Sequence, residues 1–177
     1  ELVEVYAASD RWGELVRILE GQVAGQSSDM GRIELLMESA RIYRDHLGQM
    51  DRATRAWERV LQFDGQYLEA ARSLEPIYEE KKDWRKLSTV LAVLIEEATE
   101  ADEIRRLVSR SAELSEDHLR DNEGALSAYG RLLSMEPRSE QLREAVLRLG
   151  AATQRWTQVH EYLSEARSEL AGDPGAR

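Results

Sequence analysis

The chain has 177 residues, 42% of them hydrophobic and 33% charged, with a formal net charge of -10 and no cysteine. The acidic balance argues against broad binding of nucleic acid or of anionic membranes, because both need a basic surface. The lack of cysteine excludes disulfides and thiolate metal sites and fits a cytoplasmic location. The sequence has no run of about 18 apolar residues, the length that indicates a membrane-spanning helix.

The first part of the chain carries apolar residues at helical spacing. Residues 1–9 read as the end of one helix and 11–25 as the next. The pattern resumes over 30–47, stops at Gly48, and returns over 51–63. Because Glu1 stands where a start methionine would be and already lies in an apolar helical pattern, we interpret the chain as a segment of a longer protein.

The second part repeats this succession. Helices are expected over 67–80, 84–98, 102–119 and 122–135, and Pro137 prevents continuation of the last of them. Pro76 should kink its helix or remove one hydrogen bond. Two more helices are expected over 139–151 and 155–170. The ten helices pair into hairpins at approximately 1–25, 30–64, 67–98, 102–136 and 139–170, with a tail or linker at 171–177.

A period of 72 residues underlies this succession, since Trp12, Trp84 and Trp156 are 72 positions apart (84 − 12 = 156 − 84 = 72). Overlaying residues 12–83 on 84–155 leaves 13 of 72 positions identical, among them Ala40/Ala112, His46/His118 and Ala53/Ala125. Self-similarity at a fixed spacing is typical of stacked repeat proteins.

Individual segments resemble the tetratricopeptide repeat (TPR) family. The stretch Ala125-x3-Tyr129-x3-Leu133-x3-Pro137 is similar to the second helix and closing proline of such a repeat. Ala53-x3-Trp57-x3-Leu61 matches it but ends in Gly65, and Leu36-x3-Ala40-x2-Tyr43 resembles the first helix with alanine in place of glycine. The resemblance implies one all-α domain over 1–177, a right-handed α-solenoid of about five antiparallel helix hairpins similar to long bacterial arrays. It also implies a non-catalytic scaffold whose first helices line a concave, partner-binding face.

No residue set indicates catalysis, a cofactor or a metal. His46 and His118 lie two hairpins apart, and at roughly 8–10 Å per helix layer they cannot share an ion, so we interpret both as structural and half-buried. The three repeated tryptophans are expected to be core anchors, although a ligand-stacking role is the alternative. The carboxylates do not stand out from a solvated face, so the segment is not expected to be an enzyme.

The expected binding face comprises first-helix residues that point away from the core pattern. They are Glu34, Met37, Glu38, Arg41, Arg44, Arg106, Ser109, Arg110, Glu113 and Asp117. If the four arginines share one concavity, they form a basic patch on an acidic chain and favour an acidic protein or peptide. A solvated face with helical ion pairs is the plain alternative. The rival function is a structural spacer or self-assembly element, and the chain is expected to be a monomer or a weak dimer through its end faces.

Overall fold

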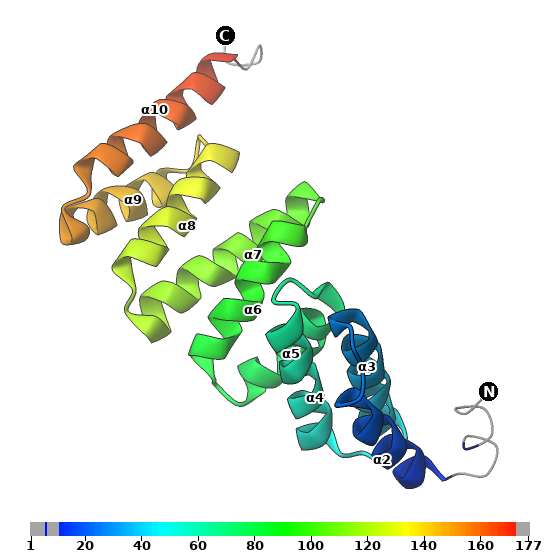
Figure 1. The fold of residues 1–177 in the computed structure, drawn as a ribbon. Helices are drawn as coiled ribbons and strands as arrows, with labels where there is room; N and C mark the ends of the chain where they lie inside the picture. The colour runs from blue at the N-terminus through cyan, green and yellow to red at the C-terminus, as the bar shows by residue number, and fades with distance from the viewer. Residues whose placement is uncertain (1–5, 7–10, 173–177) are drawn as a thin grey trace. The chain divides into compact units, whose positions relative to one another are not determined.

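The structure, a computed structural model, describes Tyr6 and residues 11–172, and every regular element in that part of the chain is helical (Figure 1). The helix expected at 1–9 lies outside the described residues except for Tyr6, and so does the tail after Gly172. The elements are α2 (Trp12–Val23), α3 (Asp29–Asp45), α4 (Met50–Phe63), α5 (Leu68–Glu80), α6 (Trp84–Glu97), α7 (Ala101–Glu113), η1 (Leu114–Leu119), α8 (Asn122–Met135), α9 (Glu140–Thr153) and α10 (Trp156–Gly172).

The helices form two compact units, which we call unit 1 (residues 1–83) and unit 2 (residues 84–177). In unit 1, α3 packs against both α2 and α4, and α4 packs against α5. In unit 2, α7 packs against α6 and α8, and α8 packs against α9 and α10. The expected all-α, TPR-like fold class of consecutive helix hairpins is therefore confirmed within each unit. That the two units form one continuous domain stays a prediction.

The first helices of the two repeats end with the same backbone turn at equivalent positions. Gly48 and Arg120 occupy the same register and are both left-handed, with φ of 60° and 54°. The following residue closes the turn in each case, because the N–H of Gln49 and that of Asp121 each donate 2.8 Å to a carbonyl six residues earlier. Ahead of this turn, the single helix expected over 102–119 is wrong in detail. It changes at Leu114 into a π-helical turn, η1, which runs to Leu119 directly before the left-handed residue.

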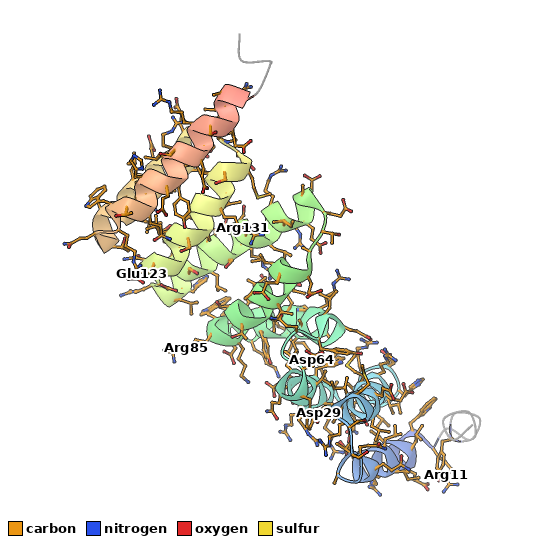
Figure 2. All side chains as sticks on the ribbon, turned by 45° about the horizontal axis from the view of Figure 1, so that its top comes forward. Arg11, Asp29, Asp64, Arg85, Glu123 and Arg131 are labelled. Carbon is orange, nitrogen blue, oxygen red and sulfur yellow. The ribbon has the colours of Figure 1, made fainter. Side chains whose placement is uncertain are left out.

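Alanines at repeated positions allow the helices to approach closely. Ala40 and Ala53 of unit 1 and their equivalents Ala112 and Ala125 of unit 2 are all 0% exposed. Larger side chains fill the remaining space, and Trp57 of α4, 1% exposed, is among the largest fully buried ones. The recurrence of small residues in the sequence therefore reflects helix packing. Charged residues such as Arg11, Asp29, Asp64, Arg85, Glu123 and Arg131 lie on the surface (Figure 2).

The repeated tryptophans and histidines are partners in ring stacks. Trp12 stacks on His46 with ring centroids 3.6 Å apart and planes 7° apart, and Trp84 stacks on His118 at 4.0 Å and 8°. Both tryptophans are half-buried and both histidines are exposed, so the expectations of core tryptophans and half-buried histidines are wrong. Trp156 departs furthest from a core anchor, since it is 55% exposed. The helix-end turns hold each histidine beside its tryptophan, which explains why the two recur together.

A double-mutant cycle on Trp84 and His118 should detect this stack. We expect a coupling free energy of about 0.5–1.5 kcal/mol, because stacked aromatic rings interact beyond the area that they bury. The two single alanine variants, the double variant and the wild type would be compared by chemical denaturation. His160→Ala, at an exposed position of α10, serves as the control and should change stability by less than about 0.5 kcal/mol. Additive effects of Trp84 and His118 would show that the rings lie together without stabilising each other.

Candidate partner-binding surface

The expected binding residues of unit 1 lie on α3, and one of them is buried. Glu34, Arg41 and Arg44 are exposed and Glu38 is half-buried, whereas Met37 is only 2% exposed. Since α3 packs against α2 on one side and α4 on the other, its apolar stripe is wider than that of a helix with one neighbour. Met37 belongs to this wider stripe, so its placement in the groove is corrected.

The two arginines of α3 in the expected binding set, Arg41 and Arg44, already pair with carboxylates. Nη2 of Arg41 donates to the two carboxylate oxygens of Glu69 on α5, at 2.7 and 3.0 Å. Arg44 pairs with its neighbour Asp45 through Nε at 2.6 Å and Nη2 at 2.9 Å. Its guanidinium also lies 5.7 Å from the centre of the Trp57 ring. These side chains are 42–49% exposed, so the pairs are solvated and weak, and they leave both arginines able to exchange partners.

The expected residues of unit 2 lie on α7 and η1. Arg106, Glu113 and Asp117 are exposed, while Ser109 and Arg110 are half-buried. The structure therefore brings the arginines together in pairs, one pair on each unit. A single patch of four arginines would need both units and stays a prediction.

The charges of the two first helices are inverted at equivalent positions. In steps of 72 residues, Glu34 and Glu38 of α3 correspond to Arg106 and Arg110. Arg41 and Arg44 correspond in the same way to Glu113 and Glu116. The two units thus present opposite charges at the same places, and a partner that suits one of these faces does not suit the other.

Two adjoining cavities open on unit 1 beside α3. The larger, of about 850 Å³, lies among the α3–α4 turn, the start of α4 and the end of α5. The smaller, of about 400 Å³, lies among α3, α4 and α5 and is lined by Arg44, Trp57, Glu69 and Arg72 as well as uncharged side chains. Met50, Pro76 and Ile77 line both. The two cavities therefore share an apolar floor, while charged residues of α3, α4 and α5 surround it.

Most lining residues of these cavities were not predicted. Only Arg44 was expected from the sequence, whereas Met50, Trp57 and Pro76 were not. Met50 is 43% exposed at the first position of α4, where the expected helix had not yet begun. Pro76 lies inside α5, which runs without a break from Leu68 to Glu80. A proline inside a helical pattern was the sequence signal at this surface, whereas the exposure of Met50 and its place near Pro76 could not be read from the sequence.

The corresponding place in unit 2 holds an internal ion pair. Glu116 of η1 forms an ion pair with Arg148 of α9 at 2.6 Å. This pairing is the main reason why the pKa of Glu116 lies below its usual value. Burial and the nearby Glu116 carboxylate together raise the pKa of Tyr129 on α8. In unit 2 the aromatic hydroxyl of the second helix therefore lies near a carboxylate of its own unit.

Glu116→Gln is expected to destabilise unit 2 by about 1 kcal/mol at pH 7, because the amide cannot form a charged pair with Arg148. A carboxyl group whose pKa is lowered by folding contributes stability above its unfolded-state pKa, here near 4.5. That contribution is lost as the pH falls through the lower, folded-state pKa. Urea denaturation at pH 7 and at about pH 3 should therefore show a difference between variant and wild type that shrinks on acidification. A difference of the same size at both pH values would contradict this origin.

Within residues 11–172, no group of three or more histidines and carboxylates is placed to hold a metal ion. The described helices also include none that is long and apolar enough to cross a membrane.

No protein-family model matches the sequence, and no curated protein is significantly similar to it. Among solved structures, one described as the crystal structure of MamA is 12% identical and aligns over 95% of this chain and 94% of that chain, with a TM-score of 0.46. A MamA RS-1 ArsTM double mutant is 14% identical over 98% of both chains, with a TM-score of 0.45. At this identity and superposition the likeness carries no argument about ligands, partners or sites.

Proposed function

We propose that the chain is a non-catalytic scaffold that binds a peptide or a partner domain, and that unit 1 supplies the binding surface. The observation that carries the proposal is the pair of adjoining cavities with a shared floor of Met50, Pro76 and Ile77. An apolar floor surrounded by charged groups suits a short segment that buries one or two side chains and orients by charge. The lack of cysteine favours a cytoplasmic location, which is part of the same proposal.

Cations slightly outnumber carboxylates around these cavities, which favours an acidic partner. The cations that line one cavity or the other are Arg44, Arg52, Arg72 and Lys81, and the carboxylates are Asp51, Glu69 and Glu80. Lys81 is paired with Asp51 at 2.8 Å, and both side chains are at least half exposed. Arg52 lies over the Tyr43 ring, 5.5 Å from its centre. Cations held by aromatic rings or by solvated pairs can bind an incoming carboxylate without leaving a buried charge behind.

Selection from a random-peptide display library on the whole chain tests this proposal. We expect enriched peptides to combine acidic and apolar residues, and their affinity to fall by at least about tenfold for Met50→Glu. That variant places a negative charge on the shared floor. Because Met50 is 43% exposed, the substitution should not destabilise the fold. Met30→Glu is the matched control, since Met30 is 64% exposed on α3 and lines neither cavity. It should leave affinity unchanged.

Two results would refute the proposal as stated. Enrichment of no peptide would argue against a peptide-binding scaffold. Enriched peptides that bind Met50→Glu as tightly as the wild type would place binding outside the two cavities.

The inverted charges of α3 and α7 favour self-assembly as a second candidate function. If α3 of one copy lay parallel to α7 of another, Glu34 would face Arg106 and Arg44 would face Glu116 along one line. Such an assembly should weaken with salt, because the Debye length falls from about 10 Å at 0.1 M to about 3 Å at 1 M. Sedimentation equilibrium at the two salt concentrations tests it. A monomer at both would exclude this candidate.

A further inference from the structure

Trp57 carries a buried hydrogen-bond donor that has no acceptor. The residue is 1% exposed, and no atom of the described residues accepts a hydrogen bond from its Nε1. A buried donor that has lost water and gained no acceptor destabilises the fold, so few such groups occur in native structures. Trp57 also lines the smaller cavity of unit 1. The unpaired donor therefore lies in a residue that a ligand in this cavity would contact.

Unit 2 shows what lies near an aromatic donor at this position. The residue equivalent to Trp57 is Tyr129, and the carboxylate of Glu116 is near enough to raise its pKa. Glu116 is paired in turn with Arg148 at 2.6 Å. The carboxylate thus comes from the last turn of the first helix, and an arginine of a following helix balances its charge.

Unit 1 lacks both members of that ion pair. Arg44 stands at the position of Glu116, and Pro76 stands at the position of Arg148. Arg44 uses Nε and Nη2 to bind Asp45, while its Nη1 has no hydrogen-bond partner among the described residues. Where unit 2 has a carboxylate, unit 1 therefore has a cation, an unpaired donor and a cavity of about 400 Å³.

We propose that this cavity binds a carboxylate side chain of an acidic partner segment, which pairs with Arg44 and accepts a hydrogen bond from Nε1 of Trp57. The carboxylate takes the chemical role that Glu116 plays in unit 2. The guanidinium of Arg44 lies 5.7 Å from the centre of the Trp57 ring, so a carboxylate that pairs with Arg44 comes close to the indole. Glu69, the carboxylate on the cavity wall, is already neutralised by Arg41 and offers little repulsion.

The shared floor adds a second requirement to the partner. Met50, Pro76 and Ile77 continue from the smaller cavity into the larger one, so an apolar residue beside the acidic one finds a place there. The recognised segment is therefore an aspartate or glutamate next to an aliphatic residue. This inference rests on the proposed function and assigns the chemistry of one subsite on the same surface.

The indole N–H signals of 15N-tryptophan-labelled protein give a direct readout. The whole chain contains four tryptophans. The signals are assigned with Trp12→Phe, Trp84→Phe and Trp156→Phe, which leaves Trp57, the fully buried residue, unchanged. The probe is an acetylated, amidated peptide of alternating glutamate and leucine, and the same peptide with lysine in place of glutamate is its control.

We expect the glutamate peptide to move the Trp57 signal saturably and to leave those of Trp84 and Trp156 in place. The shift should weaken at 1 M salt, where the Debye length is about 3 Å. Arg44→Glu should abolish the titration, because it removes the cation, and should move the Trp57 signal without any peptide, because it places a carboxylate beside the indole. Arg106→Glu, an equal charge change at an exposed residue of unit 2, should titrate as the wild type does.

Several results would overturn the assignment. One is that the glutamate peptide does not bind, or that it binds saturably without moving the Trp57 signal. Another is that the lysine peptide moves the signal as much as the glutamate peptide does. A third is that the Arg44→Glu variant titrates as the wild type does. If the Trp57 signal moves when the protein is concentrated without peptide, the cavity binds a second copy of the chain and not a separate partner. If display peptides are lost with Met50→Glu while the Trp57 signal never moves, the proposed function stands and only this subsite fails.

Discussion

Replacing Trp57 by alanine is expected to destabilise unit 1 by about 3–5 kcal/mol, the range measured for large buried aromatic residues. The side chain is 1% exposed in α4, which packs against both α3 and α5. Its removal would leave a cavity between three helices. Amide hydrogen exchange of α4 is the suitable measurement, because repeat arrays unfold in parts and a single melting temperature can miss a local loss.

Two further variants separate packing from other effects at this position. Trp57→Phe keeps most of the ring and removes the unpaired donor, so it should cost much less than alanine. Trp156→Ala removes a tryptophan that is 55% exposed and should change stability by less than about 0.5 kcal/mol. A Trp57→Ala effect as small as that of Trp156→Ala would contradict the packing of unit 1 described above.

Gly150→Ala is expected to destabilise unit 2 by about 1–3 kcal/mol, the usual cost of overpacking a core. A Cβ atom at Gly150 in α9 would lie 2.2 Å from Cγ2 of Val159 in α10. Val159 is 3% exposed and β-branched, so it cannot rotate out of the way. A helix with alanine at this position is more stable than one with glycine by about 1 kcal/mol, and this gain offsets only part of the cost of the clash.

Gly21→Ala is the matched control for this substitution. Gly21 lies in α2, and no heavy atom comes within 4 Å of a Cβ added there. Only the helix preference acts at this site, so the variant should be more stable than the wild type by up to about 1 kcal/mol. Chemical denaturation of both variants measures the contrast. A stabilised Gly150→Ala would mean that α9 and α10 are packed less tightly than their contacts indicate.

The helices could be predicted from the sequence because each has its own apolar stripe and a stop signal. Gly48 indicated the end of α3, and its equivalent Arg120 showed no such signal although it adopts the same left-handed conformation. The 72-residue period could not show how exposed each repeated side chain is. Trp12, Trp84 and Trp156 recur like core residues, yet two are half-buried in histidine stacks and the third is largely exposed.

The candidate surface could be predicted only in part, because the positions that are identical in the two repeats are mostly core positions and say little about the surface. Arg41 and Arg44 were predicted to bind a partner, which stays a prediction, and their pairing with Glu69 and Asp45 could not be read from the sequence. The informative differences were nevertheless present in the sequence. Where unit 2 has Glu116, unit 1 has Arg44, and the proposed carboxylate site rests on this difference between equivalent positions.

Binding on unit 1 is tested most directly by hydrogen exchange of the whole chain, with and without an enriched display peptide. We expect protection at the start of α4 and along α5, the segments that line the two cavities, and unchanged exchange in α7 to α10 of unit 2. Met50→Glu should remove the protection. Protection confined to unit 2, or protection of unit 1 that survives Met50→Glu, would contradict the binding surface proposed here.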